Sequence, residues 1–274
     1  MILVAYSSRD LAGSNIAKEV LNNFPFKQTS DAYQEKPIYS AEIGGKQVNL
    51  VTLKDETLYA QNLSEHFSKP ELIVFLSRHS SQSGKPTLSV HSPGNFAEAE
   101  LGGLPRTLSV CPALAMRDAL QTMAQLKMEM LLDYEVSYEC THHGPSLNVP
   151  TMFVELGSSP QQWIDSEAAE VVAKAAMKSI ADFRTCDQTA VLGIGGPHYN
   201  QRFTQMALNN EAVFGHMIPK YVLPILDVET LRQCVHRTLE KVDHAILDWN
   251  GIKSEHKLAL LKTLEGLNLP YNKV

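Results

Sequence analysis

Leu72-Ile73-Val74-Phe75-Leu76-Ser77-Arg78-His79-Ser80-Ser81 is a continuous apolar run that passes directly into a polar segment. An apolar run of this length, bounded by polar residues, is typical of a strand that is buried on both faces of a sheet. The runs at 2–7 and 189–194 have the same character, and the first of them is followed by apolar residues at helical spacing over 12–24. Alternation of buried strands with helices predicts an α/β fold.

The remaining apolar runs and helical patterns extend this alternation along the chain. Further strands are expected at 48–53, 87–91, 134–139 and 151–156, and further helices at 113–132, 159–183, 201–208, 229–240 and 254–267. We therefore expect a mixed, mostly parallel central sheet flanked by helices. A single domain over 1–274 is expected, and the Gly, Pro and Ser residues crowded into 82–106 indicate a long ordered loop or a small loop-rich subdomain there.

Composition is that of an ordinary globular protein. With 44% hydrophobic and 20% charged residues over 274 positions, a large core can form without disulfides or metal. The four cysteines lie far apart, at 111, 140, 186 and 234, and form no Cys-x-x-Cys pair. This spacing argues against a zinc ribbon, a redox motif or a disulfide framework, and it fits a reducing cytoplasm.

Charge and hydropathy exclude two further classes of protein. The N-terminus carries no basic leader, and no apolar run approaches the ~20 residues needed to cross a bilayer. We therefore expect neither export nor insertion into a membrane. A net charge of −6 predicts no broad surface that coats nucleic acid, although it allows a local basic patch. The sequence indicates no obligate protein partner, and a monomer is compatible with it.

Several histidines follow predicted strands in short stretches of Gly, Pro, Ser and Asn, which predicts imidazoles along one edge of a sheet. His79 and His91 each end an apolar run. If the two runs are neighbouring strands, both rings lie within reach of one ligand or metal. The alternative is that both rings only cap turns through hydrogen bonds.

A second cluster is Cys140-Thr141-His142-His143-Gly144-Pro145, with Glu155 in the apolar run that follows. Adjacent side chains on a strand face opposite ways, so His142 and His143 share a site only if the chain has left the strand, as Gly-Pro indicates. A carboxylate such as Glu155 is costly to bury unless it binds a metal, pairs with a cation or acts as a base; a strand-end salt bridge is the simpler alternative. Two histidines and a carboxylate suit zinc hydrolysis, but the spacing matches no zinc helix motif.

The third cluster is Gly195-Gly196-Pro197-His198, between a predicted strand and a predicted helix. Glycines there let backbone N–H groups approach a phosphate or carboxylate, although neither a dinucleotide nor a Walker motif is present. Downstream, His216 and Lys220 suit either substrate contacts or a loop that closes over the core. Cys140 is better explained as a buried, inert thiol than as a nucleophile. The other histidines lie on predicted helices or their ends and are expected to be structural or exposed: His66, His236, His244 and His256.

Taken in order, these stretches resemble the archaeal and plant D-aminoacyl-tRNA deacylases, the second type of that activity. The resemblance rests on Ser-Arg-His-Ser-Ser (77–81), His-Ser-Pro-Gly-Asn-Phe (91–96), Glu-Cys-Thr-His-His-Gly-Pro-Ser (139–146), Phe-Val-Glu-Leu-Gly-Ser-Ser (153–159), Gly-Ile-Gly-Gly-Pro-His-Tyr (193–199) and Gly-His-Met-Ile-Pro-Lys-Tyr (215–221). It extends from the N-terminal segment to about residue 221, and the C-terminal helix matches no motif of the family.

The resemblance implies a zinc-dependent hydrolase with a phosphorylase/hydrolase-like fold. The implied activity is hydrolysis of the ester between a D-amino acid and the 3′-terminal ribose of tRNA, which recycles the tRNA and keeps D-residues out of translation. The implied partner is the acceptor end of aminoacylated tRNA, and the implied cofactor is one or two zinc ions per subunit. Ester hydrolysis needs an activated water, an electrophile for the carbonyl oxygen and a proton for the leaving hydroxyl, which agrees with the residues above.

The resemblance also implies roles for individual residues. Metal ligands are expected among His91, His142, His143 and Glu155, with His91, His142 and Glu155 as the first choice. Catalytic roles are expected for His79, His142, His143 and His198. Contacts with the substrate or tRNA are expected from Arg78, Gly195, Gly196, Arg202, His216 and Lys220, with Lys85 as a further acceptor-strand contact.

Two other classes of function fit the same residues. One is a metal-dependent amidohydrolase or carboxypeptidase that acts on small acylated amino acids without contacting RNA. The other is a non-catalytic RNA-binding module, which has no need of stoichiometric zinc. The hydrolase hypothesis requires that histidines more than a hundred positions apart meet in one cleft.

Overall fold

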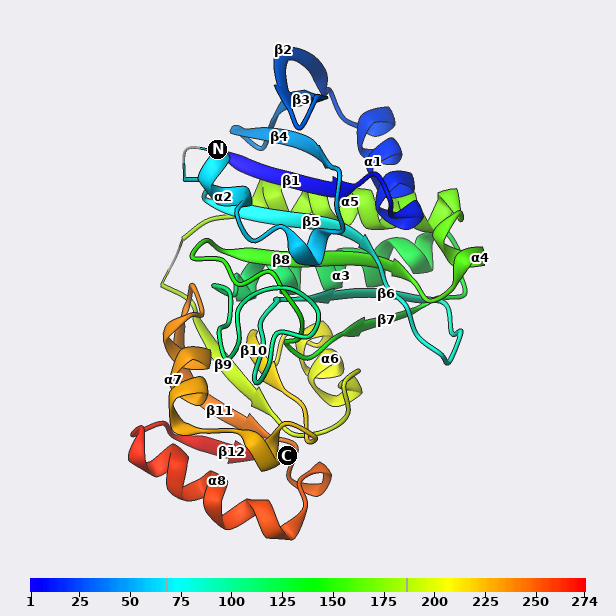
Figure 1. The fold of residues 1–274 in the computed structure, drawn as a ribbon. Coiled ribbons are helices and arrows are strands. Elements are labelled where there is room, and N and C mark those ends of the chain that lie inside the picture. Colours follow the sequence, from blue (N-terminus) through cyan, green and yellow to red (C-terminus); the bar gives the residue numbers. More distant parts are fainter. Residues whose placement is uncertain (68, 186) are drawn as a thin grey trace.

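Two β-sheets form the frame of the protein, and the computed structural model describes residues 1–67, 69–185 and 187–274 of it (Figure 1). The first sheet has eight strands in the order β2-β3-β4-β1-β5-β8-β6-β7, and the second has four in the order β10-β9-β11-β12. Both sheets are flanked by helices. This confirms the predicted α/β class with mixed, mostly parallel strands, but the sequence had indicated one central sheet rather than two.

The centre of the first sheet is built from the apolar runs that the sequence shows most clearly. Strand β5 pairs in parallel with β1 on one side and with β8 on the other, and all three are almost completely buried. Strand β6 then pairs antiparallel with β8 and parallel with β7. The strands of this sheet are β1 (Ile2–Ser7), β2 (Lys27–Tyr33), β3 (Lys36–Ile43), β4 (Lys46–Leu53), β5 (Leu72–Arg78), β6 (Thr87–His91), β7 (Glu135–Tyr138) and β8 (Thr151–Gly157).

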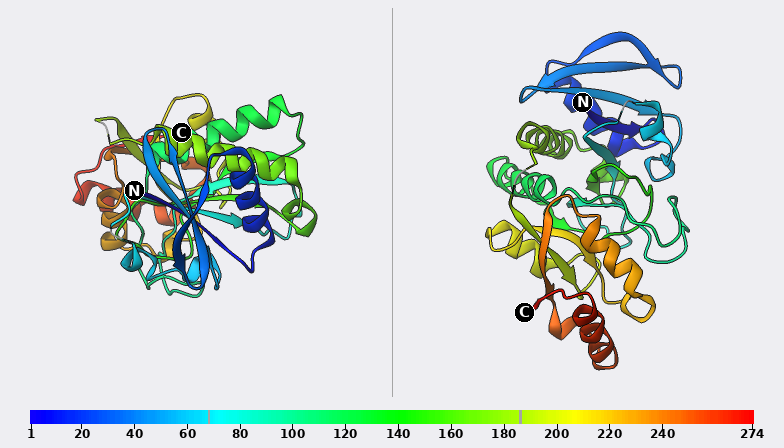
Figure 2. Two further views of the ribbon diagram at one scale, coloured as in Figure 1. Left: turned by 90° about the horizontal axis from the view of Figure 1, so that it is seen from above. Right: turned by 90° about the vertical axis from the view of Figure 1, so that its left-hand side faces the viewer.

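Three long helices cover one face of the first sheet: α1 (Leu11–Asn23), α3 (Ala113–Glu129) and α5 (Ser166–Asp182). In the right-hand view of Figure 2, α3 and α5 lie side by side against the strands. The opposite face packs against two short helical segments and a loop around residues 147–149. These short segments are η1 (Thr57–Tyr59) and α2 (Leu63–His66), and α4 (Pro160–Trp163) precedes α5.

The second sheet is wholly parallel and lies below the first in Figure 1. Its strands are β9 (Thr189–Ile194), β10 (Phe214–Ile218), β11 (Lys241–Leu247) and β12 (Tyr271–Lys273). One face packs on α3 and α6 (Gln201–Leu208), and the other on α7 (Val228–His236) and α8 (Ser254–Gly266), with η2 (Leu223–Ile225) and η3 (Trp249–Gly251) as short connections. Because α3 touches both sheets, it joins the two halves of the core.

The differences from the expected elements have local causes. Strands β2 and β3 were not predicted, because β2 is almost entirely exposed and carries no apolar alternation. The helix expected over 159–183 is two helices, since the Asp165 side chain accepts hydrogen bonds from the backbone N–H groups of Glu167 and Ala168 and starts a new helix there.

The region expected to be rich in loops contributes a buried strand and one wall of the site. Within 82–106, β6 is fully buried, and the irregular segment after it runs against the loop that follows β7. Gly102 and Gly103 have positive φ, and a Cβ on Gly144 would lie 2.2 Å from the backbone nitrogen of Gly103. The two loops can therefore meet only where glycine is present. That residues 1–274 form one domain, with or without a subdomain at 82–106, stays a prediction.

A buried carboxylate outside the site ties the second sheet to helix α3. Glu240 precedes β11, and its two oxygens accept hydrogen bonds from the backbone nitrogens of Ala113 and Leu114, at 2.9 and 3.0 Å, in the first turn of α3. We expect Glu240→Ala to lower the free energy of unfolding by roughly 2 kcal/mol or more, because each buried N–H left without an acceptor costs about 1–3 kcal/mol. Urea denaturation measures this. Glu240→Gln keeps one acceptor and should lose less, and an alanine variant as stable as the wild type would contradict this role.

Candidate active site and metal centre

The ends of five strands bring their polar side chains to one place beside the first sheet. His79 follows β5, His91 ends β6, Glu139 follows β7, Glu155 lies within β8, and His198 follows β9. Strands β5 and β6 are not neighbours, because β8 lies between them. Glu155 on β8 instead links the two histidines: its Oε2 is 3.8 Å from His79 Nδ1, and its Oε1 is 3.7 Å from His91 Nε2.

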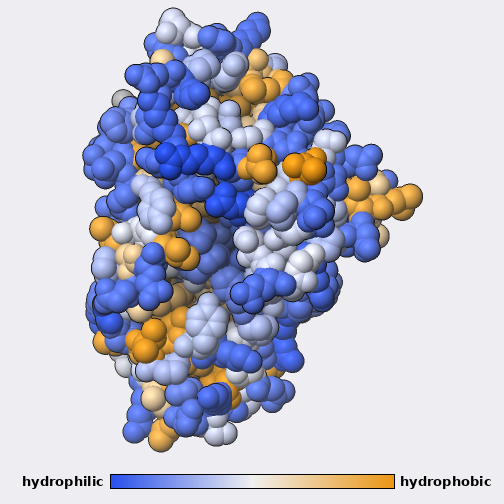
Figure 3. Space-filling view, turned by 45° about the vertical axis from the view of Figure 1, so that its right-hand side comes forward, coloured by the Kyte–Doolittle hydropathy of each residue, from blue (hydrophilic) through white to orange (hydrophobic). Residues whose placement is uncertain are grey.

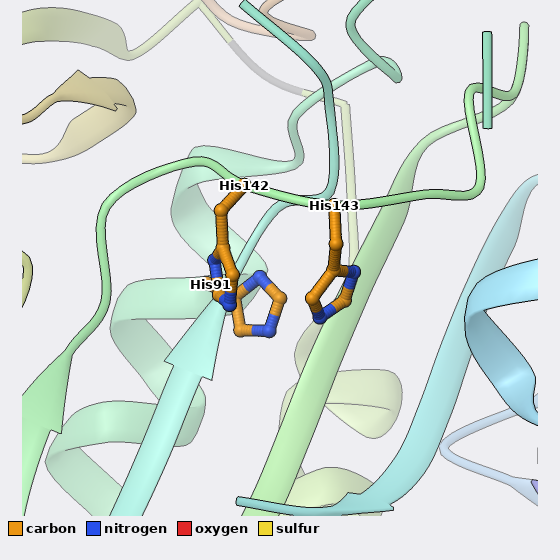
Figure 4. A group of neighbouring side chains, drawn as sticks. All are labelled: His91, His142 and His143. Carbon is orange, nitrogen blue, oxygen red and sulfur yellow. The ribbon is translucent and has the colours of Figure 1, made fainter. Parts of the chain in front are cut away.

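Three histidine rings converge at the centre of this group. Figure 4 shows His91 at the end of its strand and His142 and His143 on the loop above it, with their rings turned toward His91. The ring centroids are 4.2 Å apart for His91 and His142, 4.9 Å for His91 and His143, and 4.3 Å for His142 and His143. One ring nitrogen from each can lie within 4.8 Å of the others. Because the chain has left the strand, adjacent histidines face the same site, as the Gly-Pro sequence indicated.

In His142 and His143, Nδ1 is bonded to a backbone carbonyl oxygen, so Nε2 is the ring nitrogen that can bind a metal. His142 Nδ1 lies 2.9 Å from the carbonyl oxygen of Cys140, and His143 Nδ1 lies 2.6 Å from that of Gly144. A carbonyl only accepts, so each Nδ1 carries the proton and each Nε2 keeps its lone pair. Burial lowers the pKa of His143 to about 4 and that of His142 well below its ordinary value, with His91 acting in the same direction. Both rings are therefore neutral at neutral pH, as metal ligation requires.

His91 offers a further sign of a missing ligand. Among residues 1–67, 69–185 and 187–274, neither ring nitrogen of His91 has a hydrogen-bond partner, although the side chain is completely buried. Buried polar groups of this kind are rare without a partner, and an unseen ion is one of the accepted explanations. The donor set of the three histidines matches a catalytic zinc site with three protein ligands and one open position. The three-histidine cluster thus fits a metal ion.

The two buried carboxylates hold a proton on His79. Burial alone would lower the pKa of His79, but Glu139, whose Oε1 lies 3.1 Å from its Nδ1, and Glu155 raise that pKa to about 10. Burial alone would likewise raise the pKa of Glu139, and the imidazoles of His79 and His198 hold it well below its ordinary value. Burial would also raise the pKa of Glu155, but the imidazoles of His79 and His91 lower it below its ordinary value. Two carboxylates and a protonated imidazole therefore form a buried charged group beside the three-histidine cluster.

Glu139 and Tyr221 are site residues that sequence reasoning did not single out. Glu139 Oε2 lies 3.0 Å from His198 Nε2, and His198 Nδ1 lies 3.0 Å from the Tyr221 hydroxyl. Since the carboxylate only accepts, Nε2–H donates to Glu139, and in a neutral ring Nδ1 accepts from the tyrosine. Glu139 is the last residue of the strand predicted over 134–139. Its position next to Cys140 was the only feature of the sequence that could have marked it as a site residue. Tyr221 is the last residue of the motif at 215–221 on which the resemblance partly rests.

The site opens into a cavity of about 340 Å³, here called the main cavity. It is lined by His142, His143, His198 and the charged group around His79, and also by Arg78 and Leu101. The face of the molecule in Figure 3 is hollowed near its centre, where hydrophilic and hydrophobic residues meet. Arg78 is part-exposed and pairs with Glu56, its Nη2 lying 3.2 Å from Oε1, so a cation and its partner carboxylate line the cavity together. A small polar substrate can reach the histidines.

Three further residues were predicted to contact the substrate or tRNA: His216, Arg202 and Lys220. His216 is completely buried on β10, where Nδ1 and Nε2 face Thr141 Oγ1 and the carbonyl oxygen of Ser109, and burial lowers its pKa to about 4. His216 is not among the described residues that line the main cavity, and its part in substrate binding stays a prediction. Arg202 and Lys220 are exposed near His198, and Arg202 Nε lies 3.8 Å from Asp248 Oδ1.

The glycine turn after β9 is occupied by the protein's own groups. The nitrogen of Gly195 donates to the carbonyl oxygen of Ile218, and a Cβ on Gly196 would lie 2.6 Å from Asp248 Oδ2. Both glycines have positive φ. A phosphate seated here would meet the Asp248 carboxylate, so the turn serves the close approach of Asp248, and tRNA binding by Gly195 and Gly196 stays a prediction.

The histidines and cysteines expected outside the site lie outside it. None of His66, His236, His244 and His256 lines the main cavity in the part of the chain that is described. Cys111, Cys140 and Cys234 are buried free thiols, and burial raises the pKa of Cys140, which agrees with an inert role. Cys186 lies outside the described residues. No helix in the described ranges is both long enough and apolar enough to cross a membrane.

Comparison with known proteins gives a consistent match along the whole chain. One solved structure, titled as a conserved protein of unknown function, AF0625, superposes with a TM-score of 0.88 at 31% identity and covers 100% of this chain and 95% of that one. A nucleosidase of Campylobacter jejuni covers 67% of this chain with a TM-score of 0.43 and 9% identity.

The relatives found by sequence are described as D-aminoacyl-tRNA deacylases. A D-aminoacyl-tRNA deacylase of Thermococcus onnurineus is 36% identical over 99% of both chains, and one of Methanosarcina barkeri is 34% identical over 98% of this chain and 88% of its own length. The family model for D-aminoacyl-tRNA deacylase matches residues 66–272, a range that holds the histidines of the site together with Glu139, Glu155 and Tyr221. The chain therefore belongs to the D-aminoacyl-tRNA deacylase family.

Proposed function

We propose that this D-aminoacyl-tRNA deacylase hydrolyses the ester between a D-amino acid and the 3′-terminal ribose of tRNA with a zinc ion held by His91, His142 and His143. The observation that carries the proposal is that both ring nitrogens of the buried His91 lack a hydrogen-bond partner among the described residues, beside two neutral histidines whose Nδ1 atoms are bonded to carbonyl oxygens. A zinc ion with three histidine ligands lowers the pKa of its water to about 7 and polarises a carbonyl oxygen. The number of zinc ions per chain, one or two, stays a prediction.

The residues around the three-histidine cluster would handle the protons. Glu155 contacts His91 and is ionised at neutral pH, because the neighbouring imidazoles lower its pKa, so its Oε1 can accept a proton from an attacking water. His79 holds a proton at Nδ1 between the two carboxylates and offsets one of their two negative charges. Glu155 was first expected as a metal ligand, and its place 3.7 Å from His91 Nε2 suits that role as well.

His198 is the proposed proton shuttle for the leaving ribose hydroxyl: Nε2 stays bonded to Glu139, and Nδ1, which would exchange the Tyr221 hydroxyl for the substrate, would take up a proton and pass it to the leaving oxygen. It lines the main cavity, and its ring is held between Glu139 and the Tyr221 hydroxyl. A carboxylate that orients an imidazole, as Glu139 does here, is the arrangement that fixes the tautomer of a general acid or base. Tyr221 is a positioning residue in this scheme, because it acts on the ring of His198.

The main cavity is the proposed seat of the terminal nucleotide of tRNA. Arg78, which lines it, can contact a phosphate, and Lys85, Arg202 and Lys220 are the further cations proposed along the acceptor strand. The net charge of −6 keeps this contact local, as suits an enzyme that samples many tRNAs with modest affinity. The cytoplasm, where aminoacyl-tRNAs are made and used, is the proposed location.

Metal removal tests the proposal directly. We expect the purified protein to carry one or two zinc ions per chain by elemental analysis and to release D-tyrosine from D-Tyr-tRNA while sparing L-Tyr-tRNA. Dialysis against a chelator should lower the rate by at least about 100-fold, and added zinc should restore it. Full turnover by metal-free protein would contradict the zinc site. Cleavage of acyl-amino acids without cleavage of D-Tyr-tRNA would instead favour the amidohydrolase alternative.

A further inference from the structure

The strands of the second sheet end in a surface beside the main cavity. All four strands are parallel, so their carboxyl ends lie along one side of the sheet, here called the carboxyl edge. The label C in Figure 1 marks this edge, because β12 ends there. His198, which lines the main cavity, comes four residues after the end of β9. A substrate that extends out of the cavity past His198 therefore meets the carboxyl edge.

Contacts between the loops make the carboxyl edge one continuous surface. The backbone nitrogen of Lys220, just after β10, donates to the carbonyl oxygen of Gly196 at 2.9 Å. A Cβ on Gly196 would lie 2.6 Å from a carboxylate oxygen of Asp248, which directly follows β11. Arg202 Nε lies 3.8 Å from the other oxygen of that carboxylate. The exposed cations Lys220 and Arg202 thus share this surface with Trp249, the residue after Asp248.

Two further lysines meet on an aromatic ring at the carboxyl edge. The ammonium groups of Lys257 on α8 and Lys273 on β12 lie 4.3 and 3.9 Å from the centre of the Trp249 ring. The ring attracts each cation, but two like charges gathered at one ring repel each other. An anion beside the two ammonium groups relieves that repulsion. The lysine pair on Trp249 is therefore suited to a group such as a phosphate.

The cations on the first-sheet side of the main cavity are offset by carboxylates. Three of them each lie 3.2 or 3.3 Å from a carboxylate oxygen: Arg9 from Asp55, Arg78 from Glu56 and Lys85 from Glu135. The main cavity itself also holds the buried carboxylates of Glu139 and Glu155. By contrast, Lys220, Lys257 and Lys273 form no ion pair with any residue that the structure describes. Unpaired positive charge is thus found at the carboxyl edge.

The anionic groups of the carboxyl edge already have partners. These contacts are Asp248 with Arg202 and Glu255 with Lys253, both at 3.8 Å, and an oxygen of Val274 with the backbone nitrogen of Trp249 at 3.1 Å. Charge along the chain follows the same division. Residues 189–274 hold nine Lys and Arg against eight Asp and Glu, whereas the whole chain holds 24 against 30. The excess of acid lies before β9, so a polyanion meets less repulsion over the second sheet.

We propose that the carboxyl edge binds the acceptor stem of tRNA, with Lys257 and Lys273 contacting phosphates of its backbone. The proposal rests on the proposed function, which seats the terminal nucleotide in the main cavity. The acceptor stem continues from the end that holds this nucleotide, so the stem must lie over a surface next to the cavity. Contacts between lysine and phosphate position a nucleic acid without reading its bases, which suits an enzyme that accepts many tRNAs.

A substrate without a stem separates this surface from the active site. D-Tyrosine esterified to tRNA or to the trinucleotide CCA presents the same ester, but only the tRNA has an acceptor stem. For the wild type we expect kcat/KM to be at least about tenfold higher with D-Tyr-tRNA than with D-Tyr-CCA.

Removing the two lysine charges should weaken binding of the tRNA alone. Lys257→Gln combined with Lys273→Gln should raise KM for D-Tyr-tRNA by about fivefold or more and leave KM for D-Tyr-CCA within about twofold. A plot of log kcat/KM against log salt concentration should also become shallower, by about one to two units of slope, with D-Tyr-tRNA only.

Matched variants test whether the charges act at this place. Lys257→Arg combined with Lys273→Arg keeps both charges and should keep the wild-type KM for D-Tyr-tRNA. Lys27→Gln combined with Lys36→Gln removes two exposed charges from β2 and β3, which lie at the other end of the molecule in Figure 1. This second pair should change KM for neither substrate.

The outcomes distinguish the carboxyl-edge proposal from the proposed function. Equal kcat/KM values for D-Tyr-tRNA and D-Tyr-CCA in the wild type would overturn the carboxyl-edge proposal and leave the deacylase function intact. So would an unchanged KM in the glutamine variant, or an equal loss with both substrates. Failure of the wild-type protein to hydrolyse either ester would overturn the proposed function and this inference with it.

Discussion

Replacing His142 with alanine should lower kcat/KM for D-Tyr-tRNA by about 1,000-fold or more and should remove most of the bound zinc. His142 belongs to the three-histidine cluster; its Nδ1 bonds to the carbonyl oxygen of Cys140, and its Nε2 lies 3.7 Å from Glu139 Oε2. The metal contributes several kcal/mol to a transition state of this kind, and about 1.36 kcal/mol corresponds to a tenfold change in rate. Steady-state deacylation and elemental analysis of the same preparation measure both effects.

The controls for this prediction use the other histidines of the chain. His91→Ala should have an equally large effect, and so should Glu155→Ala if that carboxylate is the base or a ligand. His236 is exposed at the end of α7 and away from the cavity, so His236→Ala should keep both the zinc and the rate. Circular dichroism should give the same spectrum for all variants. Near-normal turnover by the three site variants would overturn the placement of the active site.

Replacing Glu139 with alanine should destabilise the metal-free protein by about 3 kcal/mol or more. The carboxylate is 1% exposed and lies between His79 and His198. Its removal leaves the protonated His79 in the interior with one carboxylate fewer, and breaking a buried ion pair by deleting one partner costs about 3–5 kcal/mol. Urea denaturation in the presence of a chelator measures the difference. Glu139→Gln keeps the volume of the side chain and should lose less.

The same variant should show a defined dependence on pH. The folded-state pKa of His79 is raised from 6.5 to about 10, so its stabilisation is complete below pH 6.5 and is lost as the pH rises toward 10. The folded-state pKa of Glu139 is lowered, so its stabilisation is present above the ordinary value of 4.5 and is lost as the pH falls below it. The difference between wild type and Glu139→Ala should therefore be largest between these limits and should shrink toward pH 10.

A surface carboxylate provides the comparison for Glu139. Glu265 is exposed on α8, and Glu265→Ala should change the free energy of unfolding by less than about 0.5 kcal/mol at every pH. If Glu139→Ala behaves like this control, or if its effect grows between pH 7 and 10, the buried ion pair with His79 does not stabilise the protein as described.

Much of the fold could be predicted because burial leaves a local record in the sequence. The apolar runs at 72–77, 151–156 and 189–194 are strands within a residue of the expected bounds, since a strand covered on both faces needs apolar side chains in succession. No strand was predicted at β2 or β3, nor at β10, β11 or β12 of the second sheet. Strand β2 is exposed and depends on backbone pairing with β3, and β11 carries Asp243 and His244 among its apolar residues.

The sequence by itself determined the class of the fold, the family and the set of polar residues that end the strands. The fold class and the strand-end residues follow from local patterns, because periodicity and turn residues report on each segment alone, whereas the family is indicated by the resemblance of several motifs taken together. Only the tertiary structure decided that β8 separates β5 from β6, that His216 is buried away from the cavity, and that Glu139 and Tyr221 belong to the site. Strand order, ring orientation and charge pairing depend on contacts between residues far apart in the chain, and no local pattern encodes those contacts.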